Sequence, residues 1–242
     1  VEVVKANILG VANLMDYGLG HSLERMLYVS TGEVYGEGGA TLDTPDGKAF
    51  TETDSGYVNC ATQRACYPSS KRAAETLCIA YGAEYGADVV IARPCHVFGP
   101  NFTESDNRVY AQFLRNVQRG EDIVMKSDGA QFRSWCYVVD CVRALLYILL
   151  KGERGEVYNI ADEKSNVTIR QLAEMIASIG GKKVVIKKPD NQESSGYNIV
   201  TKSIFSTAKL QRLGWSVSGS MVEKLSHLAS WLDIAQSGGD TQ

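Results

Sequence analysis

Short apolar runs alternate with helical patterns along this chain, and this alternation limits the folds that it can adopt. Strands are predicted at residues 26–30, 88–92, 122–125, 157–160 and 184–187. Helices are predicted at residues 1–17, 66–85, 107–119, 138–150, 168–179 and 221–234. The strands are continuous apolar runs rather than alternating ones, which is typical of a parallel sheet covered on both faces. We therefore expect an α/β fold.

Composition and charge exclude several classes of protein. With 44% hydrophobic residues among 242, the chain can bury a sizeable core. Its 25 basic and 28 acidic residues are interspersed, so we expect no nucleic-acid partner. The longest apolar runs, such as 144–150, are far shorter than the roughly 20 residues of a membrane span. The chain begins with Val1, and no signal-peptide pattern is present, so we expect a cytoplasmic protein without membrane contact.

Cysteines and histidines give no sign of a metal site. None of the six cysteines forms a C-x-x-C pair, and the three histidines are far apart in the sequence. Without a secretory signal, reduced and mostly buried thiols are a better interpretation than disulfides. We predict no bound metal.

Tyr67 and Lys71 form the motif that points most directly to chemistry. They stand four residues apart in Tyr-Pro-Ser-Ser-Lys, so they share one face of the predicted helix, and Pro68 suits its first turn. A lysine ammonium beside a phenol lowers the phenol pKa from about 10 towards neutral pH. Such a tyrosinate can take a proton from a hydroxyl as a hydride leaves the same carbon. The same spacing also occurs in helices where the pair is merely solvated.

Strands that end in polar residues surround this helix. The segments are Tyr28-Val-Ser-Thr-Gly-Glu-Val-Tyr-Gly36, Ile91-Ala-Arg-Pro-Cys-His-Val-Phe-Gly-Pro100, Arg133-Ser-Trp-Cys-Tyr-Val-Val-Asp140 and Gly155-Glu-Val-Tyr-Asn-Ile160. Active sites of open α/β sheets lie at the carboxyl ends of strands. In this order the segments resemble the extended short-chain dehydrogenase/reductase family, whose members use NAD to modify nucleotide-diphosphate sugars. The resemblance extends over about residues 5–231.

The resemblance implies a catalytic set of four residues. Thr31 fills the position that hydrogen-bonds the reacting hydroxyl, and Tyr67 is the base. Lys71 positions the cofactor ribose and lowers the Tyr67 pKa. Glu33 is similar to the glutamate that dehydratases and decarboxylases place next to the sugar, although a capping carboxylate is an equal alternative.

The resemblance to the family also implies four further residues that bind cofactor or substrate. Pro94 and Cys95 lie where the backbone passes the nicotinamide. His96 falls near the substrate diphosphate, where the family usually has Asn, and a packed imidazole is an equal alternative. Arg133 resembles the arginine that binds this diphosphate, a bidentate task suited to guanidinium. Asp140, in contrast, is predicted to cap the following helix.

The resemblance leaves the reaction open. All such enzymes begin by oxidising the sugar at C4 with NAD, and then act as epimerases, 4,6-dehydratases or decarboxylases. Gly32 stands where one dehydratase group has an aspartic acid, which argues against that group. The run from Arg64 to Cys78 is similar to that of the UDP-glucuronate decarboxylase branch. We predict an epimerase/dehydratase-type enzyme, with a UDP-glucuronate decarboxylase or an inactive dimerising module as alternatives.

One expected feature is missing from the sequence. The family opens with a strand and a G-x-x-G-x-x-G turn that hold the NAD pyrophosphate, and this chain has no such motif. We therefore expect a Rossmann-like doubly wound sheet that lacks its N-terminal half, in a chain that alone binds NAD weakly and is inactive.

Three parts are predicted along the chain. Residues 1–100 would be a Rossmann remnant, and residues 101–236 mainly a smaller α/β substrate domain, with about 134–160 returning to the sheet. Residues 237–242 would be a disordered tail. The family commonly forms homodimers through the two helices at 1–17 and 66–85, and we expect the same here.

Overall fold

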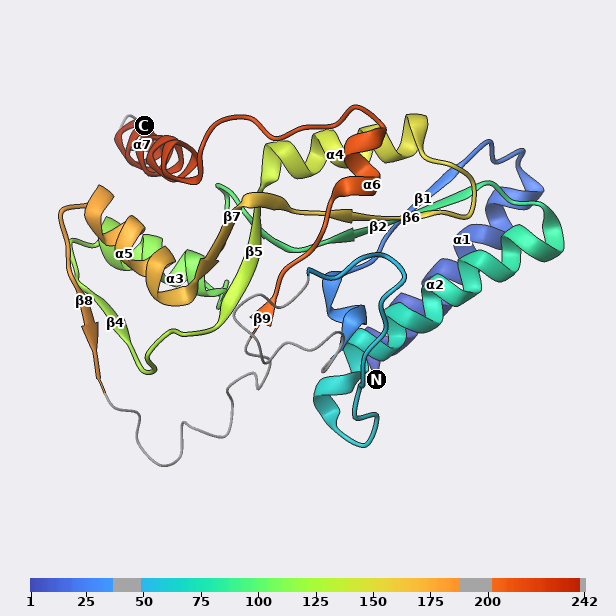
Figure 1. Cartoon of the computed structure of the whole chain (residues 1–242), viewed down its shortest axis with the longest axis horizontal. Coiled ribbons are helices and arrows are strands. Elements are labelled where there is room, and N and C mark those ends of the chain that lie inside the picture. Colours follow the sequence, from blue (N-terminus) through green and yellow to red (C-terminus); the bar gives the residue numbers. More distant parts are fainter. Residues whose placement is uncertain (37–48, 188–201, 240–242) are drawn as a thin grey trace. The chain divides into compact units, whose positions relative to one another are not determined.

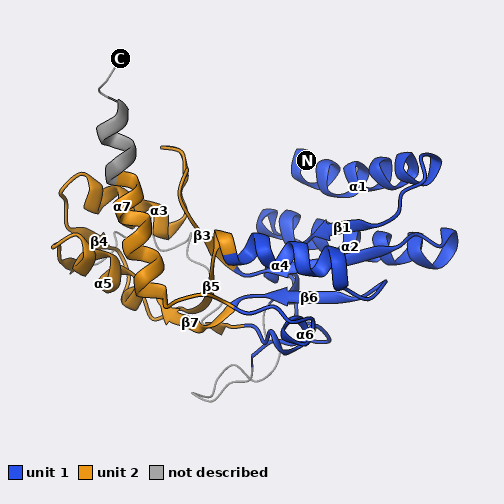
Figure 2. Ribbon diagram, turned by 90° about the horizontal axis from the view of Figure 1, so that it is seen from above, with its two compact units in different colours: residues 1–95, 140–161, 205–216 blue, residues 96–139, 162–204, 217–242 orange. Residues whose placement is uncertain are grey.

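Two compact units make up the chain in the computed structural model (Figure 2). Unit 1 contains residues 1–95, 140–161 and 205–216, and unit 2 contains residues 96–139, 162–204 and 217–242. The structure describes residues 1–36, 49–187 and 202–239, with side chains up to 232. The sequence places the division between the two domains at residue 100, and in the structure the first segment of unit 1 ends at residue 95. The segment predicted to return to the first domain is 134–160, and the corresponding segment of unit 1 is 140–161. The second returning segment, 205–216, is not apparent from the sequence.

Unit 1 is built on a parallel sheet of the order β1-β2-β6. Its elements are α1 (Glu2–Gly20), β1 (Met26–Val29), the 3-10 turns η1 (Gly32–Tyr35) and η2 (Gln63–Ala65), α2 (Cys66–Tyr85), β2 (Val89–Pro94), α4 (Val138–Lys151, with its first two residues in unit 2), β6 (Val157–Ile160) and α6 (Ala208–Arg212). In the register, Val29 pairs with Ala92 and Ile91 with Val157. The predicted α/β class with a parallel sheet is therefore confirmed.

Helices α1 and α2 pack side by side on one face of this sheet, and α4 lies on the other (Figure 1). Met15 of α1, Ala74 of α2 and Ile91 of β2 are fully buried in one apolar cluster. Burying a side chain of the size of Met15 or Ile91 contributes about 1.5–3 kcal/mol. Helix α2 ends at Tyr85, and the next residue, Gly86, has a φ of 74°, the left-handed conformation that terminates helices. This packing holds α2 beside the carboxyl end of β1.

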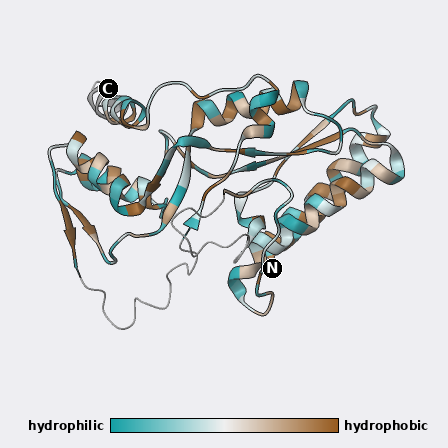
Figure 3. Cartoon of the chain, in the orientation of Figure 1, coloured by the Kyte–Doolittle hydropathy of each residue, from teal (hydrophilic) through white to brown (hydrophobic). Residues whose placement is uncertain are grey.

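Unit 2 has a mixed sheet and a small parallel one. Its elements are β3 (His96–Phe98), α3 (Val109–Gln118), β4 (Ile123–Met125), β5 (Phe132–Tyr137), β7 (Asp162–Thr168), α5 (Ile169–Ile179), β8 (Val184–Ile186), β9 (Lys202–Ser203) and α7 (Met221–Gly239). β5 pairs in parallel with β3 and β9 and antiparallel with β7. The pair β4–β8 consists of hydrophobic residues only, as the colouring in Figure 3 shows. The core of the unit is made by α3, α5, α7 and the strands between them.

Several elements differ from the sequence-based expectation. Strands β3, β5, β7 and β9 were not predicted, because their polar residues interrupt the apolar pattern. Asp140 is not the N-cap of α4: it lies inside the first turn, fully buried, with Arg143 Nη1 3.2 Å from its Oδ1. Helix α7 includes 237–239 of the predicted tail, and 240–242 lie outside the described residues. No helix in the described part of the chain is long and apolar enough to cross a membrane.

Candidate active site

The turn after β1 carries Thr31 and Glu33. Thr31 is the N-cap of η1, and its Oγ1 accepts a hydrogen bond from the Glu33 amide at 3.2 Å. The hydroxyl proton is not used in this bond, so Thr31 can donate it to a ligand oxygen. A Cβ added to Gly32 would lie 2.5 Å from Cζ of Phe205. Glycine therefore allows the buried Phe205 ring to pack against the turn.

Helix α2 presents Tyr67 and Lys71 beside this turn. The Lys71 Nζ donates to the carbonyl oxygen of Val29, the last residue of β1, at 2.9 Å. It also lies 6.0 Å from the ring centroid of Tyr67 and 5.0 Å from that of Tyr28. Ser70 links α2 to α1, because the side chain of Asn7 on α1 donates to the Ser70 hydroxyl at 2.9 Å. Lys71 thus ties helix α2 to the carboxyl end of β1.

Burial and charge act on Lys71 in opposite directions. Burial lowers the pKa of its ammonium, while the carboxylate of Glu75, one helical turn further on, raises it. Tyr28 lies below the ammonium with its hydroxyl buried, and burial raises the pKa of this phenol well above its ordinary range. Tyr28 is consequently a neutral neighbour of Lys71.

Glu33 is paired with an arginine that the sequence analysis did not assign to the site. Its carboxylate Oε2 lies 2.8 Å from Nη2 of Arg64, and both side chains are exposed. Arg64 belongs to η2, directly before α2, so the pair joins the Thr31 turn to the start of the Tyr67 helix. Neither the role next to the sugar nor the capping role that we considered for Glu33 includes a pairing with Arg64.

Pro94 and Cys95 lie at the carboxyl end of the neighbouring strand, β2. Pro94 is the last residue of β2, and the Cys95 amide donates to the Ile160 carbonyl at 2.9 Å. Because β1 and β2 are parallel, these residues and Thr31 lie at the same carboxyl edge of the sheet. The structure therefore brings Thr31, Tyr67, Lys71 and the Pro94–Cys95 backbone to one edge of unit 1.

His96 and Arg133 belong to unit 2, on paired strands. The imidazole of His96, on β3, is tilted against the Trp135 ring of β5 at 5.2 Å. Desolvation of the ring and the positive charge of Arg133 both lower the His96 pKa. Because the residue as a whole is exposed, water offsets part of this desolvation. Arg133 is only 4% exposed, and burial lowers the pKa of its guanidinium to about 10.

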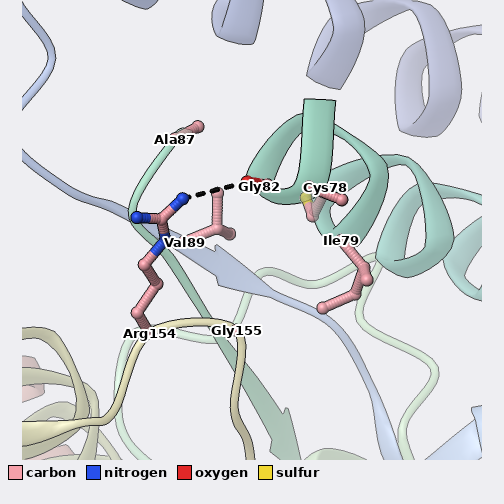
Figure 4. A pocket seen from close by; sticks show the side chains of 8 residues that line it. Cys78, Ile79, Gly82, Ala87, Val89, Arg154 and Gly155 are labelled. Atoms are coloured by element: carbon pink, nitrogen blue, oxygen red, sulfur yellow. Dashed lines mark hydrogen bonds between the residues drawn. The ribbon is translucent and has the colours of Figure 1, made fainter. Parts of the chain in front are cut away.

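A separate pocket of unit 1 is lined by none of the candidate catalytic residues (Figure 4). It has a volume of about 280 Å³ and lies near the C-terminal end of α2, between Ile79 and Val89. Arg154 closes one side by donating to the Gly82 carbonyl at 2.9 Å. The Cys78 thiol at its wall is held protonated, because burial and the charge of Glu75 raise its pKa to about 12. The carboxyl edge of the sheet is therefore the better candidate.

Within the part of the chain that the structure describes, no group of three or more histidine, cysteine, aspartate or glutamate side chains is arranged to hold a metal ion.

Comparisons with known proteins identify the family of the chain. The model of the NAD dependent epimerase/dehydratase family matches residues 1–161. UDP-glucuronic acid decarboxylase 6 from Arabidopsis thaliana is 34% identical over 226 residues, covering 93% of this chain and 62% of the relative. UDP-glucuronic acid decarboxylase 3 from the same plant is 32% identical, with the same coverage. This chain thus spans about three-fifths of the length of these curated relatives.

Solved structures share the fold. UDP-glucose 4-epimerase from Thermotoga maritima, solved with UDP-glucose, superimposes with a TM-score of 0.77 at 27% identity, covering 96% of this chain and 71% of that one. The dTDP-glucose 4,6-dehydratase DesIV from Streptomyces venezuelae, at 24% identity, has a TM-score of 0.79 and covers 97% and 67%. Together with the family match over residues 1–161, these likenesses confirm the expected resemblance: the chain belongs to the NAD dependent epimerase/dehydratase family.

Proposed function

We propose that the whole protein is an NAD-dependent enzyme that oxidises a nucleotide-diphosphate sugar at C4 to a 4-keto sugar, as epimerases and dehydratases of this kind do. The observation that carries the proposal is the placement of Lys71. Its ammonium lies between the Tyr67 ring and the end of β1, two residues before Thr31. A base, its cationic neighbour and a hydroxyl donor thus share one edge of the sheet.

The residues present fit one end of NAD. Lys71 uses one of its three donors on Val29, so two can bind ribose hydroxyls, and Tyr67 lies beside it. The Pro94–Cys95 backbone would pass the nicotinamide. When bound, NAD supplies an acceptor for the hydride from the sugar. The sequence contains no G-x-x-G-x-x-G turn for the pyrophosphate, so the fit covers the nicotinamide-ribose end alone.

Tyr67 and Thr31 would handle the proton. The Thr31 hydroxyl would donate to the reacting sugar oxygen and orient it, while the Tyr67 phenolate removes the hydroxyl proton. The Lys71 ammonium stabilises this phenolate by its charge.

In unit 2, His96 and Arg133 would bind the substrate diphosphate. A buried guanidinium presents paired N–H donors to an anion and strengthens the contact, because little water competes with it. We further propose that unit 1 is the Rossmann remnant and that unit 2 is the substrate domain.

UDP-glucuronate decarboxylation is the second candidate. The curated relatives at 32–34% identity are UDP-glucuronic acid decarboxylases. Gly32 also favours this candidate over the dehydratase group with an aspartic acid at that position, because a side chain there would displace Phe205. Glu33 would then act next to the sugar, and its partner Arg64 offers a guanidinium to a sugar carboxylate.

A homodimer formed through α1 and α2 is also proposed. The outer faces of the two helices expose large apolar side chains: Leu9 (56%), Leu14 (62%) and Tyr17 (65%) on α1, and Ile79 (43%) and Tyr85 (58%) on α2. Exposed apolar side chains that gather in one patch are typical of protein interfaces. Since none of the six cysteines, all of which lie within the described residues, forms a disulfide, we propose a reducing, cytoplasmic location.

Product analysis tests the proposed reaction. The whole protein would be incubated with NAD and either UDP-glucuronate or UDP-glucose. Release of carbon dioxide identifies a decarboxylase, a 4-keto-6-deoxy product a dehydratase, and an inverted C4 an epimerase. Tyr67→Phe should lower kcat by roughly 100-fold or more, because it removes the general base. Tyr57→Phe, at an exposed tyrosine, is the matched control.

The opposite result supports the inactive-module alternative. If no sugar is converted, or if Tyr67→Phe keeps wild-type turnover, the proposed reaction is wrong. Residues 1–242 alone should bind NAD weakly or not at all, since the pyrophosphate motif is missing; micromolar affinity in a calorimetric titration would contradict this.

A further inference from the structure

A buried ion pair connects the strand β2 to the catalytic helix. Arg93 donates to Glu75 twice, from Nε to Oε1 at 2.9 Å and from Nη2 to Oε2 at 2.6 Å. The two side chains are 12% and 10% exposed. Two parallel, charge-assisted hydrogen bonds give a defined geometry. A buried pair of this kind is nevertheless weak evidence for stability, because removing both charges from water offsets most of their attraction.

Glu75 brings the ion pair close to Lys71 along helix α2. The two residues are one turn apart on α2, and Lys71 in turn follows Tyr67 by one turn. The titratable groups that face the ammonium are Glu75 and Tyr67 on its own helix and Tyr28 on β1. Glu75 is the one carboxylate among them. On the sides of α1 and η1, Asn7 is uncharged, and Glu33 is paired with Arg64.

From Arg93 the pair acts on the turn that carries Thr31. The Arg93 Nη1 donates to the Tyr35 hydroxyl at 3.1 Å, and Tyr35 is the last residue of η1. The Tyr35 hydroxyl donates in turn to Oδ1 of Asn159 at 2.6 Å. The same Nη1 also donates to the Glu52 carbonyl at 3.0 Å. One guanidinium therefore holds the far end of the turn that begins at Thr31.

Arg72 provides a second link between this turn and α2. Its Nε donates to the Val34 carbonyl at 2.6 Å, and its Nη2 donates to the Gly56 carbonyl at 2.7 Å. A polar cavity of about 350 Å³ adjoins both arginines and Glu75.

We propose that the Glu75–Arg93 pair is a positioning unit: Glu75 places its carboxylate one helical turn from Lys71, while Arg93 fixes the Thr31 turn against helix α2. This inference rests on the proposed function, because that function makes Lys71 and Thr31 catalytic. Its test is chosen so that it requires neither NAD nor a sugar.

The test measures the protonation of Lys71 directly. The whole protein would be labelled with trace acetic anhydride across a range of pH, and the acetylation of Lys71 followed by mass spectrometry. The variants are Glu75→Gln, Glu75→Gln combined with Arg93→Met, Glu75→Asp and, as a control on the same helix, Glu84→Gln. Circular dichroism would establish that each variant is folded.

Loss of the carboxylate should shift the Lys71 titration to lower pH. The reason is that burial, which favours the neutral amine, is then unopposed. We expect the shift in Glu75→Gln and in the double variant, and a titration close to the wild type in Glu75→Asp and Glu84→Gln. The double variant keeps the test decisive if Glu75→Gln alone does not fold, because it leaves no unpaired Arg93.

Two results would overturn the proposal. One is an unchanged Lys71 titration in folded variants that lack the Glu75 carboxylate. The other is failure of both of these variants to fold, which would make the pair a requirement of the fold. Either outcome is independent of the sugar assay, so a failure of the proposed reaction and a failure of this inference are distinguishable.

Discussion

Two glutamate–arginine pairs contact opposite ends of the turn η1 and differ mainly in their exposure. In Glu33–Arg64 the closest atoms are 2.8 Å apart, with 41% and 63% of the side chains exposed. In Glu75–Arg93 they are 2.6 Å apart, with 10% and 12% exposed. The distances are nearly equal, so distance does not tell the pairs apart. Solvent exposure does: water surrounds and screens the first pair but reaches only a small part of the second.

This difference suggests different tasks. An exposed pair gains little from its partner and can exchange it for a ligand at small cost. A buried pair cannot let go without leaving a charge in the interior. On the proposed function, unit 1 has rearrangeable charges where a sugar would bind and fixed charges that hold the last residue of η1. Rigid support of this kind is what a catalytic constellation needs.

Breaking the buried pair from one side should have the largest effect. Arg93→Met leaves the Glu75 carboxylate buried without its partner, so we expect a loss of about 3–5 kcal/mol in the free energy of unfolding. Urea denaturation followed by tryptophan fluorescence measures it. Glu75→Gln combined with Arg93→Met should recover most of the loss, because no unpaired charge remains. A single variant as stable as the wild type would mean that the pair is effectively solvated.

Removing the hydroxyl next to the buried pair should have a smaller effect. Tyr35 is 1% exposed, and Tyr35→Phe leaves the Oδ1 of Asn159 without this donor. We expect a loss of about 1–3 kcal/mol, the usual penalty for an unsatisfied buried polar group. The exposed Tyr57→Phe should stay within about 0.5 kcal/mol of the wild type in the same urea titration. Equal losses in the two variants would remove Tyr35 from the buried network.

The sequence was sufficient for local features of the site and insufficient for its partners. Tyr67 and Lys71 could be placed on one helical face from their spacing alone, and the continuous apolar run of β2 predicted a parallel strand. Arg93 and Glu75, in contrast, are 18 positions apart on a strand and a helix, and no periodicity relates them. Their contact exists because α2 packs against the sheet.

Strand β5 shows a second limit. Its residues Phe132–Tyr137 include the buried polar side chains of Arg133 and Ser134, so neither an apolar run nor an alternating pattern marks it. Arg133 was recognised as a candidate through the family resemblance, while the strand that holds it was missed. A residue at a site follows the chemistry of the ligand, and its sequence pattern is then a poor guide to secondary structure.

Breaking the exposed pair should have the smallest effect on stability. Arg64→Met removes a guanidinium that is 63% exposed, so we expect a change within about 1 kcal/mol in the same urea titration. In about 1 M sodium chloride the Debye length is about 3 Å, and the difference from the wild type should vanish. A loss comparable with that of Arg93→Met, or one that persists in salt, would show that Arg64 contributes by packing rather than by charge. The contrast between the two pairs would then no longer rest on solvent exposure, and Arg64 would have to be treated as part of the fixed support of the site.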